Sequence, residues 1–399
     1  MDLDAVLARA VALGASDVHL KIGQPPMIRR NGEVEPLADA PALGGPDLER
    51  AVTIVAAGRA ERRAQFDNHG ELDLAYEAPG LPRFRVNAFR QRGAISMAFR
   101  AIPVIIPSFS DLHLPSGITR LAEEWRGLVL VTGATGSGKS TTLASIVDHI
   151  NRTRRQHVVT IEDPIEMLHS DRGCIINQRE VGIDTASFGE ALRRVLRQDP
   201  DVILIGELRD AETAQTALQA AESGHLVLST LHTVDASETL GRLVEFFAPE
   251  KQQMVRSILA GVLKGVVSQR LLPRVGGGRI VAVEVMVTND RIADLIRENR
   301  PEEIPDAISE GSYYDMQTMT LALIELVLDN LVEREIAENA APNRHDFIIA
   351  LEHAEKLRAA AALNPKLVQQ ADGRPAEPAA EAGDNEHSLR LVRVPGAAG

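Results

Sequence analysis

The chain has one cysteine, Cys174, among its 399 residues. A single cysteine excludes an intramolecular disulfide and any Cys₄ or Cys₂His₂ zinc site, and it is typical of a protein of the reducing cytosol. Aromatic residues make up 3% of the chain, which leaves little material for the base-stacking platforms of single-strand nucleic-acid-binding proteins. No run of about 18 apolar residues occurs, and the start, Met1-Asp2-Leu3-Asp4, lacks the positive charge of a signal peptide. We therefore expect neither export nor a membrane span.

Basic residues are also in the minority, with 43 Lys and Arg against 56 Asp and Glu, so the formal net charge is −13. A molecule of this charge repels polyanions unless its cations are gathered on one face. Apolar residues make up 44% of the chain, as in ordinary soluble proteins. At roughly 150 residues per domain, the length predicts two or three compact units.

The pattern of the chain predicts four parts. Residues 1–101 combine an amphipathic start with short alternating runs and predict a small α/β domain. Residues 102–115 carry three prolines and predict an interdomain linker. Residues 116–355 form the largest part, and residues 356–399 are rich in Ala, Pro, Gly and Glu, which predicts a disordered tail.

Short apolar runs alternate with helical patterns in the third part, which predicts an α/β fold with a mainly parallel sheet. Residues 235 to about 352 are expected to be mostly helical, with two periodic apolar segments, Ile258–Leu271 and Met319–Leu331. The predicted strands are Leu128–Val131, Val158–Ile161, Val202–Ile205 and Leu226–Ser229.

A glycine-rich loop follows the first of these strands and precedes a helical pattern. It is a full match to the phosphate-loop motif G-x-x-x-x-G-K-[ST], and a glycine-rich turn with a chance lysine is the alternative. Its glycines let backbone amides wrap a polyphosphate, Lys139 should reach the β and γ phosphates, and Ser140 should bind Mg²⁺. The residues expected to bind the nucleotide are Gly133, Ala134, Thr135, Gly136, Ser137, Gly138, Lys139, Ser140 and Thr141.

Two strands end in acids. Asp201–Glu207 is an apolar run that ends in Glu207, at the position where a Walker-B-type group meets Mg²⁺ or orients water. Thr160–Glu166 holds Glu162, Asp163 and Glu166 around a proline. Like charges near a metal-bound polyphosphate are costly unless they bind the cation or take a proton. The alternative for Glu207 is an ordinary acid at the end of a strand, and the alternative for Thr160–Glu166 is a solvated loop.

Two histidines, His225 and His232, flank the fourth strand. Neither has the spacing of a metal ligand. His232 either contacts the nucleotide site or is a structural group, and His225 is the weaker candidate.

The arginines suggest a site shared between subunits. Between Arg50 and Pro103 nine arginines face five acids, a local charge of +4. Arg83 and Arg85 alternate with apolar residues, so both should leave the sheet on one face, where they could meet a phosphate held by another subunit. Arg193 and Arg197 lie four apart on a helical pattern and should share a face. For Arg83 and Arg85 the alternative is a solvated sheet face. For the second pair it is a surface face with ion pairs.

The motifs resemble those of the secretion ATPase superfamily of type II and type IV secretion. Gly133–Ser140, Thr160–Glu166, Leu196–Asp210 and Gly224–His232 are similar, in order, to its Walker A, Asp box, Walker B and His box. Gly14–Leu20 and Arg83–Phe89 also resemble its twitching-motility (PilT) branch. The resemblance covers about residues 1–352.

The resemblance implies a PAS-like N-terminal domain, a RecA-like ATPase domain with C-terminal helices, and a homo-hexamer that hydrolyses Mg²⁺-ATP. It implies that Glu207 is the Walker B glutamate, that Glu162 polarises water, that Arg85 and Arg100 reach the nucleotide, and that Arg193 and Arg197 form a second arginine pair. Together with the acids above it gives Ser140, Glu166 and Glu207 as the Mg²⁺ side chains. It further implies a cytoplasmic motor that works through a platform protein at the inner membrane, associates only peripherally with that membrane, and drives pilus retraction.

Two departures and two alternatives accompany this interpretation. Pilus-assembly and type II secretion relatives commonly carry a four-cysteine module, which Cys174 alone cannot form, so retraction is favoured over assembly. The branch's motif Ala-Ile-Arg-Asn-Leu-Ile-Arg-Glu corresponds to Arg291–Glu298, whose first half differs, and this departure concerns retraction rather than hydrolysis.

A nucleic-acid translocase on the same core is disfavoured by the acidic charge. A scaffold that binds ATP without hydrolysing it is disfavoured by the two acids.

Overall fold

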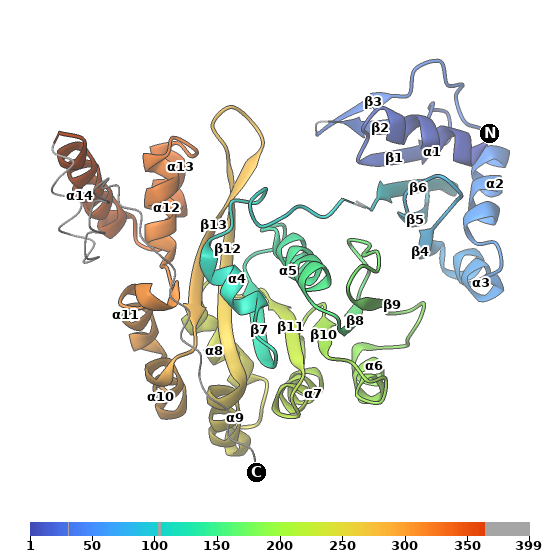
Figure 1. Ribbon diagram of the computed structural model, residues 1–399. Coiled ribbons are helices and arrows are strands. Elements are labelled where there is room, and N and C mark those ends of the chain that lie inside the picture. The colour runs from blue at the N-terminus through green and yellow to red at the C-terminus, as the bar shows by residue number, and fades with distance from the viewer. Residues whose placement is uncertain (31, 103–104, 364–399) are drawn as a thin grey trace, which may run out of the picture. The chain divides into compact units, whose positions relative to one another are not determined.

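The computed structural model describes residues 1–30, 32–102 and 105–363, and the chain forms two β-sheets with helices around them (Figure 1). Residues Met1–Phe347 make one compact unit that holds both sheets, and a second unit begins at Ile348. Each sheet has its own hydrophobic core.

The first sheet is antiparallel throughout, in the order β3-β2-β1-β6-β5-β4. Its core holds three fully buried phenylalanines, and the rings of Phe84 and Phe99 meet edge to face at 6.3 Å. These elements agree with the α/β pattern predicted for residues 1–101. In chain order they are α1 (Leu3–Ala12), β1 (Asp17–Lys21), β2 (Met27–Arg30), β3 (Glu33–Pro36), α2 (Gly45–Val55), α3 (Ala60–His69), β4 (Glu71–Tyr76), β5 (Phe84–Gln91) and β6 (Ala94–Ala101).

The second sheet has the order β13-β12-β7-β11-β10-β8-β9, in which only β13 runs antiparallel to its neighbour. Strands β7, β10 and β11 are buried at every position, which explains their continuous apolar runs. All four predicted strands are confirmed. The elements are α4 (Ser116–Ala122), β7 (Gly127–Thr132), α5 (Lys139–Thr153), β8 (His157–Glu162), β9 (Ile175–Glu180), α6 (Phe188–Val195), β10 (Val202–Ile205), α7 (Ala211–Glu222), β11 (Leu226–Leu231), α8 (Ala236–Glu245), α9 (Pro249–Val262), β12 (Leu263–Pro273) and β13 (Arg279–Val287).

The prediction of a helix over Ile258–Leu271 is confirmed as far as Val262 and wrong for the rest of the segment. Helix α9 ends at Val262, and the chain continues directly into β12, which forms the long hairpin with β13 (Figure 1). The valines of this segment favour a strand, and β12 gains a parallel partner in β7 and an antiparallel one in β13. Pairing with two distant strands therefore overrides the local helical spacing in β12. More than half of residues 235–352 lie in helices, so the prediction that this part is mostly helical is confirmed apart from the hairpin.

Helices follow the hairpin up to residue 363. The predicted helix Met319–Leu331 is confirmed as α12, although it ends three residues earlier. The tail expected from residue 356 is wrong for 356–363, because this alanine-rich stretch continues α14; residues 364–399 lie outside the described residues. The elements are α10 (Asp290–Glu298), the short η1 (Pro301–Glu303), α11 (Ile304–Ser309), the short η2 (Ser312–Tyr314), α12 (Met319–Leu328), α13 (Arg334–Ala340) and α14 (Arg344–Leu363).

Within the described part of the chain, none of the helices has both the length and the apolar character needed to cross a bilayer.

Candidate nucleotide-binding and catalytic site

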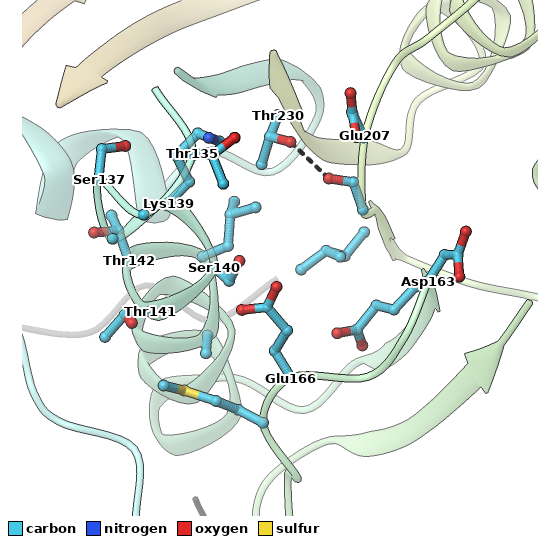
Figure 2. Close-up of a pocket in the computed structure, with 18 of the residues that line it drawn as sticks. Thr135, Ser137, Lys139, Ser140, Thr141, Thr142, Asp163, Glu166, Glu207 and Thr230 are labelled. Carbon is cyan, nitrogen blue, oxygen red and sulfur yellow. Dashed lines mark hydrogen bonds between the residues drawn. The ribbon is translucent and has the colours of Figure 1, made fainter. Parts of the chain in front are cut away.

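The carboxyl ends of four parallel strands meet at one edge of the second sheet. The phosphate loop follows β7, Glu162 ends β8, Glu207 follows β10 and His232 follows β11. Parallel α/β sheets bind their ligands at this edge. All four segments line one cleft of about 880 Å³ (Figure 2), a volume suited to a nucleotide-sized ligand.

The phosphate loop lies between β7 and the first turn of α5. Its last glycine, Gly138, has a left-handed φ of 94° and directly precedes α5, so the free amides of that helix face the cleft. A Cβ atom on Gly133 would lie 2.5 Å from the carbonyl oxygen of Gln269 on β12. Both positions therefore require glycine, because one needs the left-handed backbone and the other has no space for a side chain.

Lys139 is buried at the start of α5, among the polar groups of the loop. Its Nζ donates to the carbonyl oxygens of Gly133 at 2.8 Å and Ala134 at 3.0 Å, and lies 3.5 Å from Nδ1 of His232. Burial lowers the pKa of Lys139, and the nearby acids, of which Glu207 contributes most, oppose that shift. The lysine is a buried cation in a cleft bordered by acids.

Two cationic or hydrogen-bonding partners hold the Glu207 carboxylate. Its Oε1 lies 3.1 Å from Nε2 of His232, and its Oε2 accepts from Nε of Arg209 at 2.9 Å. The preceding peptide is fixed as well, because the Thr230 hydroxyl donates to the Gly206 carbonyl at 2.7 Å, the dashed line in Figure 2. His232 therefore joins the site, as one of its two predicted alternatives has it.

Glu162 has partners that carry no charge. Its Oε1 accepts from the hydroxyl of Thr160 at 2.6 Å and from Nε2 of Gln178 at 3.2 Å. Burial raises the pKa of the Glu162 carboxyl, the hydrogen bonds oppose that shift, and the charge of Glu166 adds to it. An acid with a raised pKa is a better proton acceptor than an ordinary glutamate.

The two other acids of this loop point in different directions. The carboxylate of Glu166 points into the cleft toward Ser140, whereas Asp163 points away from the phosphate loop (Figure 2). Among the described residues, the Ser140 hydroxyl has no hydrogen-bond partner. A hydroxyl and a carboxylate thus face each other beside the loop.

These oxygens fit Mg²⁺ held through a substrate. No cluster of three His, Cys, Asp or Glu side chains suited to a metal is found in residues 1–30, 32–102 and 105–363. Mg²⁺ does not require such a cluster, because it keeps several waters and binds one or two side chains together with substrate phosphates. Ser140, Glu166 and Glu207 all line the cleft and offer this kind of donor set.

The arginines of the first sheet occupy different environments. Arg100 lines the cleft, and its Nε donates to Oδ1 of Asp17 at 2.8 Å. Arg85 lies directly opposite Arg100 in the β5–β6 register and is exposed. Arg83 is predicted to leave the sheet on the same face as Arg85. It is instead half-buried before β5 and forms ion pairs with Glu77 at 3.2 Å and Glu180 at 3.1 Å.

The second arginine pair lies outside the cleft. Helix α6 ends at Val195, so Arg197 lies beyond the helix rather than on its face, and the prediction of a shared helical face is wrong. Arg193 forms an ion pair with Glu212 at 3.1 Å. His225 bonds the Ser223 hydroxyl and the Ala220 carbonyl, which is a structural role.

Several groups of the site were not anticipated from the sequence. Three of them lie within the recognised motifs and two lie between motifs, and their residue types alone give no signal for a place in the site; only their positions near strand ends could have done so. They are Thr160, His169, Gln178, Arg209 and Thr230.

The chain is similar to known proteins in sequence and in fold. Residues 113–323 match the family model "Type II/IV secretion system protein". The chain is 44% identical over 347 residues to the "Type IV pilus retractation ATPase PilT" of Pseudomonas aeruginosa, an alignment that covers 87% of this chain and 100% of that protein. The crystal structure of the pilus retraction motor PilT with bound ADP superposes with a TM-score of 0.81 at 43% identity, covering 87% of this chain and 98% of that one. The Legionella pneumophila ATPase DotB gives a TM-score of 0.70 at 30% identity, covering 85% and 94%.

Proposed function

This chain is an ATPase of the Type II/IV secretion system protein family, and from that premise we propose that it works as a homo-hexameric motor for retraction of a type IV pilus. The observation that carries the proposal is the match with a pilus retraction ATPase, which covers the whole of that protein and 87% of this chain. The single, buried Cys174 supports retraction over assembly, because it leaves no four-cysteine module. The motor would act from the cytoplasmic side of the inner membrane, on a platform protein.

We infer a division of work between the two catalytic acids. The loop amides and Lys139 bind the phosphates of ATP, and Glu162 accepts the proton of the attacking water, since burial and neutral partners keep it basic. Glu207, bridged by Arg209 and His232, organises the γ-phosphate end. Mg²⁺, when bound, neutralises phosphate charge, and Ser140, Glu166 and Glu207 would hold it.

Arginines would complete the site. Arg100 lines the cleft of its own chain and would reach the nucleotide there. Arg85, its neighbour in the β5–β6 register, would reach a nucleotide across a subunit boundary, where an arginine speeds phosphoryl transfer by about 10³–10⁵-fold. Arg193 and Arg197 would supply charge at the rim. The net charge of −13 gives no support to a nucleic-acid partner.

The test compares two lysine variants of the full chain. Lys139→Ala should lower phosphate release by about 100-fold or more, because it removes the cation that stabilises charge on the transferring phosphate. Lys251→Ala, at an exposed position of α9, should retain the wild-type rate. Thermal unfolding shows that both variants are folded.

Retraction itself is tested in a pilated bacterium that lacks its own retraction ATPase. The wild-type chain should restore pilus retraction, and Lys139→Ala should not. If the purified chain hydrolyses ATP but restores no retraction, the retraction proposal fails, while its identity as an ATPase stands.

A further inference from the structure

Glu284 is a buried acid outside the nucleotide cleft. Its residue is 9% exposed, on β13. It pairs with Ser268 on β12, which in turn pairs with Thr132, the last residue of β7 before the phosphate loop. The Thr132 hydroxyl donates to the Ser268 hydroxyl at 3.0 Å. A row of polar side chains thus crosses three strands from the phosphate loop to Glu284.

The Glu284 carboxylate faces the first backbone amide of two helices. Its Oε1 accepts from the N–H of Ala236, the first residue of α8, at 3.0 Å, and the N–H of Met319, the first residue of α12, is near enough to lower the pKa of the carboxyl. The first N–H groups of a helix have no partner within it, and an anion at a helix N-terminus is favoured by the helix dipole. One carboxylate therefore joins the starts of two helices.

The usual capping side chains do not replace this contact. Asp235 caps α8 by accepting from the N–H of Glu238, and Thr318 caps α12 by accepting from the N–H of Leu321. Both caps serve the third helical residue, which leaves the first N–H to Glu284. Burial raises the pKa of Glu284, and the charge of Asp235 adds to that shift, while the two amides and Arg270 oppose it.

The start of α8 is tied to the catalytic site by a short segment. His232 is separated from α8 by Thr233, Val234 and Asp235 only. The Thr233 and Thr239 hydroxyls are 2.6 Å apart, and the N–H of Val234 donates to the Glu238 carboxylate at 2.9 Å. This segment is therefore attached to the first turn of α8 by side-chain hydrogen bonds, and His232 directly precedes it in the chain.

We propose that Glu284 is a positioning residue for ATP turnover, which fixes His232 against Glu207 through the start of α8 and couples it to α12. A displacement of either helix start would then change the contact between His232 and Glu207, which is 3.1 Å long. The inference rests on ATP hydrolysis by this chain and not on pilus retraction.

The experiment is a double-mutant cycle with Glu284→Gln and His232→Ala. The amide keeps the shape and one acceptor oxygen, but its NH₂ group cannot accept from the second helix start. Glu284→Gln should lower kcat about five-fold, with KM and the affinity for a non-hydrolysable ATP analogue changed less than about two-fold, since the phosphate loop is untouched. In the His232→Ala background the same substitution should have no further effect on kcat.

The control is Glu325→Gln on the exposed side of α12, which should leave kcat unchanged. Equal losses of kcat in both backgrounds would mean that Glu284 acts only through general stability, and an unchanged kcat in the wild-type background would mean that it has no role; either result overturns the proposal. If thermal unfolding shows that Glu284→Gln is not folded, Glu284→Asp replaces it. Its loss of kcat is then compared between the wild-type and His232→Ala backgrounds in the same way. Turnover by the wild-type chain is the positive control, and its absence would refute the ATPase activity instead.

Discussion

At the scale of single residues, the two acids of the site differ in what surrounds them. Glu162 is held by a hydroxyl and an amide, and Glu207 by a guanidinium and an imidazole. Burial disfavours the charged form of a carboxylate, and at Glu162 it outweighs the hydrogen bonds that favour that form. The two glutamates of one cleft therefore have different neighbours, to which we assign different roles.

This difference predicts the acid side of the pH–rate profile. Burial raises the pKa of Glu162 above its ordinary value of 4.5, so the ionised form is lost as pH falls through a value higher than 4.5. If Glu162 accepts the proton of water, the acid limb of kcat should lie above pH 4.5, and Glu162→Gln should lower kcat by about 100-fold or more. Phosphate release measured across pH gives both quantities.

A matched exposed acid controls that measurement. Glu190→Gln, which removes a surface ion pair with Arg194 on α6, should leave both the rate and the profile unchanged. An acid limb at or below pH 4.5, or a Glu162→Gln variant that turns over normally, would assign the proton transfer to another group.

The sequence predicts the location of a site residue well where that location follows from the order of the strands. Lys139, Glu162 and Glu207 follow buried strands, so their convergence at one edge of the sheet could be inferred from chain order. The positions of Arg83 and Arg193 could not, because their partners, Glu180 and Glu212, are distant in the sequence. Ion pairs of this kind depend on tertiary packing, which no local pattern encodes.

At the scale of elements, the local sequence pattern identifies the central strands of the second sheet but not the β12–β13 hairpin. Strands β7, β8, β10 and β11 are buried on both faces, so apolar runs identify them. Strand β12 has apolar residues at spacings that suit a helix as well, and only its pairing with β7 and β13 decides. Prediction of that hairpin requires knowledge of which strand is its neighbour.

One buried amide joins α5 to the segment before β9 and gives a prediction about stability. The Asn151 side chain, near the end of α5, donates to the carbonyl of Ser170 at 2.8 Å and accepts from the N–H groups of Arg172 at 3.1 Å and Cys174 at 3.2 Å. Asn151→Ala leaves these groups without their partner, so the free energy of unfolding should fall by about 2–4 kcal/mol. Urea denaturation measures this change.

The control is an asparagine in a less demanding place. Asn87→Ala on β5 removes one exposed hydrogen bond to Asp73 and should change the free energy of unfolding by less than about 0.5 kcal/mol. Equal effects of the two substitutions would contradict the assignment of Asn151 as the link between α5 and the segment before β9.

At the scale of the whole molecule, the proposed ring makes each site depend on two chains. The phosphate loop, Glu162 and Glu207 come from one chain, and Arg85 would come from its neighbour. Because a ring contact of this kind is heterologous, a defect in the loop and a defect in the arginine lie on opposite sides of the same boundary.

Mixing two inactive variants separates a composite site from a site within one chain. Arg85→Ala retains its own Lys139, and Lys139→Ala retains its own Arg85, so a random mixed ring should contain about one intact site in four. Phosphate release by the mixture should exceed the sum of the two variants alone. Lys139→Ala mixed with Glu207→Gln should show no such gain, because both residues line the same cleft of one chain. A mixture of the first pair that remains inactive would place Arg85 and the phosphate loop on the same side of the boundary, since only then can neither chain supply what the other lacks.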